Sequence, residues 1–173
     1  MKFKWREIGI QVGSIDPNKD PKSPIGPKGG SIFAQKALEI ILGDNEIKEM
    51  INCILEYEET EEIMISVLRL IKSTKAVEIA YNIYKNSEGQ RAYTAVWIIK
   101  HIAHPMSLKW VEEFLDDDNV AGWGIGLVDQ LAFAGWIDID MVEEILKKAE
   151  NHKFEGVRAR AISVRDYLKE QED

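Results

Sequence analysis

The chain has 173 residues, of which 45% are hydrophobic and 30% charged, a balance typical of one globular domain rather than a disordered segment. Its formal net charge of −8 argues against non-specific binding of DNA or RNA, which requires a surface rich in Lys and Arg. The single cysteine, Cys53, excludes an intrachain disulfide and a cysteine metal cluster.

Membrane insertion and export are not expected from the sequence. No apolar run approaches the ~18 residues that are needed to cross a bilayer. Residues 1–9 carry charges at close intervals and lack the continuous apolar stretch of a signal peptide. We therefore expect a cytoplasmic protein.

Residues 1–30 differ in composition from the rest of the chain. Partial alternation of apolar residues between Phe3 and Val12 indicates a short extended piece. Four of the five prolines follow, between residues 17 and 27, and proline removes a backbone donor and restricts the residue before it. We expect a non-helical N-terminal arm over residues 1–30, anchored against the body of the protein by Trp5.

Residues 31–173 are predicted to be a helical domain. Ser31 follows two glycines and is expected to be the N-cap of the first helix, which ends at Gly43. Apolar residues at helical spacing, separated by turn residues, predict helices over residues 32–42, 45–57, 60–72, 74–86, 89–103, 105–116, 119–133, 138–151 and 155–170.

The predicted helices repeat along the chain. Small residues recur every 29 positions, at Ala37, Ser66, Ala95 and Gly124, each with apolar residues one and four positions later. A last copy follows at Ala161, where Arg165 replaces the second apolar residue, as a solvent-facing terminal repeat would tolerate. A two-helix unit that recurs in this way is typical of a solenoid, and the alternative is an irregular helical bundle.

The stretch from Arg91 to Leu168 resembles HEAT repeats. Second helices of HEAT repeats often read Val-Arg-x-x-Ala followed by an apolar residue, and Val157, Arg158, Ala161 and Ile162 match that pattern. The resemblance implies an all-α protein folded as an α-α superhelix, a right-handed solenoid of about four to five helix pairs. HEAT-like proteins are mostly interaction scaffolds, and small acidic members from bacteria resemble immunity proteins that neutralise secreted toxins.

The repeat also predicts which side of each helix is free. At 100° per residue, the core side of the third copy holds Ala95, Val96, Ile98, Ile99 and Ile102. The opposite sides of the third and fourth copies hold Thr94, Trp97, Lys100, His101, His104, Trp123, Gly126, Asp129, Gln130 and Phe133.

Aromatic residues among polar ones are typical of protein interfaces, so we predict a partner-binding surface. Its residues are Trp97, His101, Trp123, Gly126, Asp129, Gln130 and Phe133. Alternatively, the N-terminal arm or the final helix covers these rings.

Carboxylates form a second candidate surface. Asp116, Asp117 and Asp118 follow one another at a predicted helix junction. A run of this kind steers a basic partner toward docking, although a solvated turn explains it equally well. We include these three residues in the predicted partner-binding surface.

No reaction centre, cofactor site or metal site is predicted. The glycines at 122, 124 and 126 lack the spacing and the preceding strand of a dinucleotide-binding loop. His101 and His104 lie three positions apart, but zinc needs further ligands that the sequence does not indicate.

The function predicted from the sequence is binding of another macromolecule. The most specific form of this hypothesis is an immunity-type inhibitor of a basic toxin or nuclease, with a basic protein as partner and nucleic acid disfavoured. Two alternatives remain open: a HEAT-like enzyme, such as an alkylpurine DNA glycosylase or a bilin lyase, and a self-associating scaffold.

Overall fold

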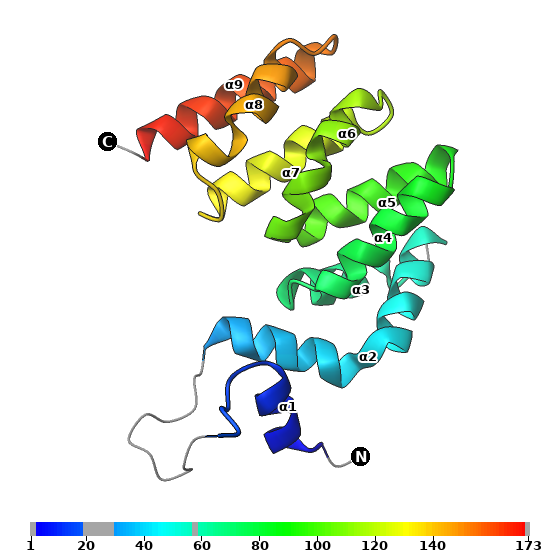
Figure 1. Ribbon diagram of the computed structural model, residues 1–173. Coiled ribbons are helices and arrows are strands. Elements are labelled where there is room, and N and C mark those ends of the chain that lie inside the picture. Colours follow the sequence, from blue (N-terminus) through cyan, green and yellow to red (C-terminus); the bar gives the residue numbers. More distant parts are fainter. Residues whose placement is uncertain (1–2, 19–29, 57–58, 172–173) are drawn as a thin grey trace.

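The computed structural model describes residues 3–18, 30–56 and 59–171. Over these residues the protein is all-α, without strands, and its helices pack in contact with one another (Figure 1). The helices of this described part are α1 (Trp5–Gln11), α2 (Ser31–Leu55), α3 (Glu61–Leu70), α4 (Thr74–Asn86), α5 (Gly89–Ile102), the 3-10 helix η1 (Pro105–Trp110), α6 (Val111–Asp116), α7 (Ala121–Phe133), α8 (Ile139–Glu150) and α9 (Glu155–Glu170).

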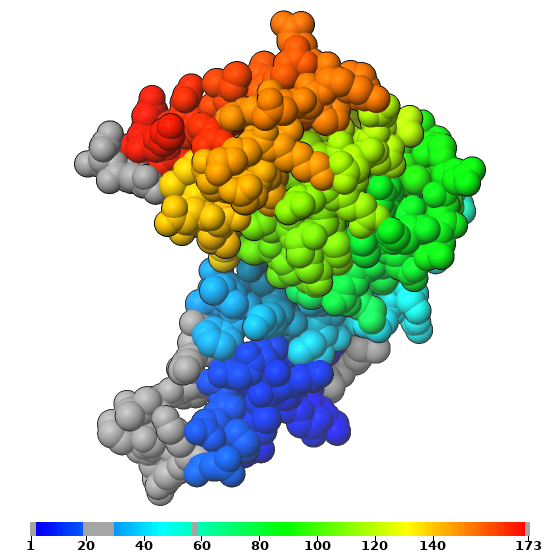
Figure 2. Space-filling model, turned by 45° about the horizontal axis from the view of Figure 1, so that its top comes forward, coloured from blue at the N-terminus to red at the C-terminus, as the bar shows by residue number. Residues whose placement is uncertain are grey.

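Successive helices pack as pairs. α2 packs on α3, α4 on α5, α6 on α7, and α8 on α9. The second helices of the pairs form a row, in which α3 contacts α5, α5 contacts α7, and α7 contacts α9. Chain order therefore runs from one end of the molecule to the other, from blue to red in Figures 1 and 2. This arrangement is compatible with a helical repeat.

Small residues recur at buried positions on three helices of this row. Ala95 on α5, Gly124 on α7 and Ala161 on α9 are all buried. The earlier copies differ, because Ser66 is exposed and Ala37 is only partly buried. The first two copies, on α2 and α3, therefore lack the burial of the later three.

The core side predicted for α5 is confirmed. Its five predicted core residues are each at most 1% exposed: Ala95, Val96, Ile98, Ile99 and Ile102. The neighbouring helices contribute other fully buried side chains, among them Leu68, Phe114 and Leu127. The helical periodicity of the sequence therefore identifies the buried stripe of this helix correctly.

The break predicted at Gly43 is present, although the helix continues beyond it. Gly43 has φ 77° and ψ 162°, values outside the helical region that favour glycine, and α2 bends there into two arms. The predicted cap is wrong by one residue. Ser31 is the first residue of the helix, and Gly30 is its N-cap.

The prediction of a wholly non-helical arm is wrong over residues 5–11. These residues form α1, whose Ile8 is buried, and α1 packs against α2 (Figure 1). The partial alternation of apolar residues suggested an extended segment. A short helix can instead contact α2 through the apolar residues on one of its sides. Trp5, the expected anchor, is 61% exposed. Residues 19–29 of the predicted arm lie outside the described residues.

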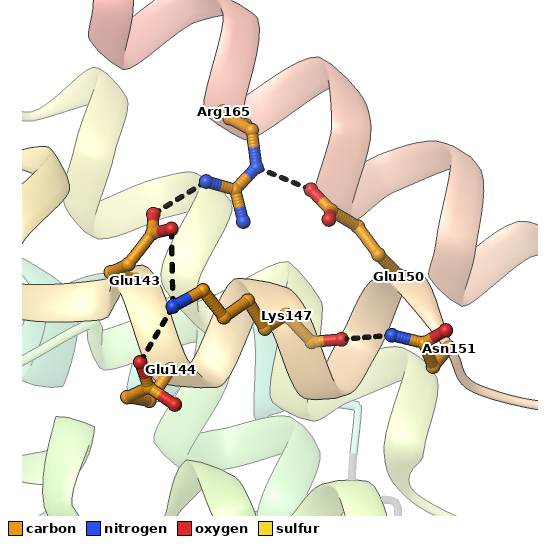
Figure 3. Close-up of polar contacts among 6 residues, drawn as sticks. All are labelled: Glu143, Glu144, Lys147, Glu150, Asn151 and Arg165. Carbon is orange, nitrogen blue, oxygen red and sulfur yellow. Dashed lines mark hydrogen bonds and ion pairs between the residues drawn. The ribbon is translucent and has the colours of Figure 1, made fainter.

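Arg165 joins α8 to α9 instead of facing solvent (Figure 3). Its guanidinium lies 2.5 Å from a carboxylate oxygen of Glu143 and 2.5 Å from one of Glu150, and its side chain is 15% exposed. The hydrogen bond from Arg165 holds the pKa of the Glu143 carboxyl below its usual value. Charge-assisted hydrogen bonds thus occupy the position where the other copies carry an apolar residue.

Replacing Gly124 by alanine is expected to destabilise the protein. A Cβ atom there would stand 2.9 Å from the Cβ of the buried Phe114, so α6 and α7 would have to move apart. Overpacking of this kind costs about 1–3 kcal/mol, whereas alanine gains ~1 kcal/mol over glycine inside a helix. We therefore expect the free energy of unfolding to fall by up to ~2 kcal/mol.

Gly122→Ala is the matched control, because a Cβ atom at Gly122 meets no heavy atom within 4 Å. This variant should be as stable as the original protein or more so. Urea-induced unfolding followed by circular dichroism measures both variants. Equal effects at the two glycines would contradict a close-packing role for Gly124.

Candidate functional site

Four rings gather where α5 meets α7. Tyr93, Trp97 and His101 are spaced four residues apart and therefore share one side of α5, and Trp123 adjoins them from α7. The ring centroids are 5.6 Å apart for Tyr93 and Trp123, and 4.0 Å apart for Trp97 and His101. We call these four residues the aromatic cluster. Both indoles are half-buried, so neither is sealed inside the protein.

A cavity of about 270 Å³ opens beside the aromatic cluster. Three of the four rings line it, together with one carboxylate, one isoleucine and two uncharged polar residues. The lining residues are Ile54, Glu61, Gln90, Tyr93, Thr94, Trp97 and Trp123. The lining comes from α2, α3, α5 and α7, so the cavity depends on the packing of successive pairs. Nε1 of Trp123 is buried and has no hydrogen-bond acceptor among the described residues.

His101 is held against Trp97 as a neutral ring. Its Nδ1 donates to the carbonyl oxygen of Trp97 at 2.9 Å, because a carbonyl can only accept. Burial lowers the pKa of His101 by more than the hydrogen bond to the Trp97 carbonyl raises it, and the nearby charges of Lys100 and Arg69 lower it further. The imidazole is therefore uncharged near pH 7 and acts as a flat packing partner for the indole.

Lys100 and Gln130 connect α5 to α7 beside the aromatic cluster. With its amide oriented to satisfy both partners, Gln130 donates to the carbonyl oxygen of Lys100 at 2.7 Å and accepts from Lys100 Nζ at 3.0 Å. Lys100 Nζ also lies 5.8 Å from the ring centroid of Trp123, within the range of a cation–π contact. Burial lowers the pKa of this ammonium group.

Two positions that we predicted to face outward are buried. Thr94 is 5% exposed, and Gly126 lies beneath long side chains of α5 and α9. A Cβ atom at Gly126 would stand 3.2 Å from Arg160 Nη1 and 3.5 Å from Lys100 Cε. The expectation that Gly126 faces outward is therefore wrong. Arg160 also approaches Asp129, at 4.0 Å.

Phe133 lies apart from the aromatic cluster. It is ten residues beyond Trp123 on α7, about 15 Å along the helix axis. Its ring packs on Tyr167 of α9, with the centroids 4.2 Å apart, and it remains 60% exposed. The final helix thus partly covers Phe133, whereas the described part of the N-terminal arm packs on α2.

The carboxylates of residues 116–118 make contacts within the chain. Asp116 pairs with Lys148 of α8 at 2.8 Å, and Asp118 pairs with Lys153. Asp117 accepts a hydrogen bond from the hydroxyl of Tyr84 on α4 at 3.2 Å. The turn between α6 and α7 therefore contacts both α4 and the α8 region. None of its three aspartates lines the cavity beside the aromatic cluster.

The structure brings part of the predicted surface together. Trp97, His101, Trp123 and Gln130 meet at the α5–α7 junction, whereas Phe133 and the three aspartates lie elsewhere. The prediction missed Tyr93 and Glu61, which also line the cavity. The spacing of four residues between Tyr93 and Trp97 was the available signal for Tyr93. Glu61 lines the cavity because α3 packs against α5, a contact that the local sequence does not reveal.

A scan against protein-family models, a search of curated proteins and a search of solved structures each found no match. Among the described residues, no three His, Cys, Asp or Glu side chains are placed to hold a metal ion. In the same part of the chain, no helix is both long enough and apolar enough to span a membrane.

Stability is expected to fall as the pH is lowered from 7.5 to 5.5. Burial lowers the folded-state pKa of both His101 and His104, so below the unfolded value of about 6.5 the unfolded chain binds more protons. The stabilising contribution of the two neutral histidines is complete above that pH and is lost as the pH falls toward their folded-state pKa values. Protonation would also remove the Nδ1 acceptor of His104 that caps η1 through the Met106 backbone N–H.

Urea midpoints at the two pH values measure this effect. The double variant His101→Gln, His104→Asn should lose less stability over the same range, since asparagine keeps an N-cap acceptor. An unchanged pH dependence in the double variant would contradict the assignment to these two histidines.

Proposed function

We propose that this chain is a HEAT-like repeat protein, a right-handed α-α superhelix of four to five helix pairs that binds another protein. The pairing of successive helices supports this proposal, as does the row of buried small residues at Ala95, Gly124 and Ala161. Of the four residues that carry the resemblance to HEAT repeats, Val157 and Ala161 are buried in α9, whereas Ile162 is 50% exposed. In a solenoid of this kind each pair contacts its neighbours and leaves a continuous surface free for a partner.

The aromatic cluster is the observation that carries the binding proposal. Trp97 and Trp123 are half-buried, are held by contacts from two helices, and line a cavity. Tryptophan and tyrosine in partly formed pockets dominate the binding energy of protein interfaces, with polar residues around them. The lining combines three aromatic rings with the single carboxylate of Glu61, which suits recognition of a partner better than catalysis.

The net charge of −8 favours a basic partner. We therefore propose an immunity-type inhibitor that binds a basic toxin or nuclease. The aspartates of residues 116–118 are compatible with this role despite their internal ion pairs. The side chains of Asp116 and Asp118 are 69% and 51% exposed, and ion pairs this exposed contribute little to stability, so a basic partner can compete for them.

The proposal predicts that a captured partner depends on the aromatic cluster. The immobilised protein should retain a basic protein from a lysate of the source organism and should suppress the toxic or nuclease activity of that protein. Trp97→Ala should weaken binding by about 30-fold, which corresponds to ~2 kcal/mol for a central aromatic residue. Calorimetry with the purified partner measures the change.

The control for this experiment is Phe154→Ala, which removes a 43% exposed ring from the α8–α9 turn. It should leave the affinity unchanged, and circular dichroism should show that both variants fold. Equal retention by the original protein and by Trp97→Ala would rule out a partner site at the aromatic cluster. Retention without loss of activity in the partner would rule out the inhibitor role.

An apolar patch supports self-association as a second candidate function. We define the patch as Ile32, Leu70 and Trp136, which are 52%, 70% and 42% exposed. Gln35 Nε2 donates to the carbonyl oxygen of Leu70 at 2.9 Å, which holds the start of α2 beside the end of α3. Ile32 and Trp136 line one cavity of about 230 Å³. Leu70 is not part of this lining, but its carbonyl contact with Gln35, which is, places it beside the cavity. Exposed apolar residues gathered in this way mark contact surfaces.

If the apolar patch joins two copies, the mass measured by light scattering should rise with protein concentration. Leu70→Lys should then abolish the rise, because it places a charge in the contact. Ile162→Lys is the control, since Ile162 is 50% exposed on α9, at the opposite end of the chain. A constant monomer mass for the original protein would exclude self-association.

A further inference from the structure

The cavity beside the aromatic cluster has the chemistry of a cation site. The rings of Tyr93, Trp97 and Trp123 border it from two helices, and Glu61 adds a carboxylate from a third. The face of an aromatic ring attracts ammonium and guanidinium groups, most strongly for tryptophan and when the site is shielded from water. Several rings around one small space are the usual means of holding such a group.

The size of the cavity suits one side chain. At about 270 Å³ it lies just below the range of ~300–1,000 Å³ that is typical of sites for whole small-molecule ligands. A protein partner would therefore fill it with a single residue while the remaining contacts form outside.

The charges around the cavity favour a positive occupant. Glu61 is in the lining, Glu62 follows it on α3, and the chain as a whole carries −8. His101, which packs on Trp97, is held neutral by burial and so does not repel a cation near pH 7. Lys100 Nζ, 5.8 Å from the ring centroid of Trp123, is tied to Gln130, and burial lowers its pKa. Arg69 of α3, whose charge also acts on His101 and Lys100, is not part of the lining.

We infer that this cavity binds an arginine side chain of the basic protein partner, an inference that rests on the proposed function. The flat guanidinium can stack on the indole of Trp97 or Trp123 while an edge donates to the Glu61 carboxylate. Lysine fits less well, because its compact ammonium group is strongly hydrated and cannot stack as a plane.

Two short peptides test this inference without the partner. The probes are acetylated Gly-Gly-Arg-Gly-Gly amide and the same peptide with citrulline, which has nearly the shape of arginine but no charge. The indole N–H signals of Trp97 and Trp123, assigned by Trp→Phe substitution, are followed by NMR during titration. The arginine peptide should shift both signals with a dissociation constant of about 1 mM, and the citrulline peptide should bind at least fivefold more weakly.

Glu61→Gln should weaken binding of the arginine peptide about fivefold, which corresponds to about 1 kcal/mol. Glu144→Gln makes the same chemical change on α8, where the Glu144 side chain is 82% exposed, and should leave the affinity unchanged. Equal shifts from the two peptides, or an unchanged affinity in Glu61→Gln, would overturn the inference.

The peptide result is separable from the capture experiment. If a protein partner binds through Trp97 but the arginine peptide does not, the arginine inference alone fails. If the arginine peptide binds but no partner depends on Trp97, the proposed function fails and the cation site stands.

Discussion

The close approach of α7 to its neighbours is the contact on which the other features of the protein depend. Gly124 leaves so little room at Phe114 that an added methyl group would collide with it, and Ala95 and Ala161 are equally buried on the adjoining helices. Because protein interiors are densely packed, small residues at these points set how near the helix axes lie. Gly126, which lies against Lys100 of α5 and Arg160 of α9, is the residue of α7 at which these neighbours approach, and their separation sets the distance between the rings on α5 and the ring on α7.

Contacts within the chain hold the side chains of the aromatic cluster in place, which suits the binding role proposed for it. His101 is hydrogen-bonded to the carbonyl oxygen of Trp97, and the Lys100–Gln130 pair holds α5 to α7 beside Trp123. Side chains that are already fixed lose little conformational entropy on binding, which raises affinity without adding contacts. A half-buried cluster of this kind can contribute to binding more than its small exposed area would indicate.

The helices and the buried side of α5 could be predicted from the sequence, because the positions of apolar residues repeat with the period of the helix. The burial of Gly126 could not be predicted, since it depends on Arg160, a side chain 34 positions away on α9. The aspartates of residues 116–118 illustrate the same limit. Their partners Tyr84, Lys148 and Lys153 belong to other helix pairs, and local charge does not reveal them. The α1 helix was missed because seven residues are too few for a clear period.

The bend at Gly43 separates a loosely packed N-terminal part of the molecule from a more tightly packed remainder. The helix pairs hold the core residues from position 47 onward. The structure describes all of residues 31–46, and none of them is buried. The first arm of α2 and the α1 helix on it can therefore open as one local unfolding unit while the remaining helices keep their contacts. Breathing motions of the native protein should begin at this end and leave the α5–α7 junction undisturbed.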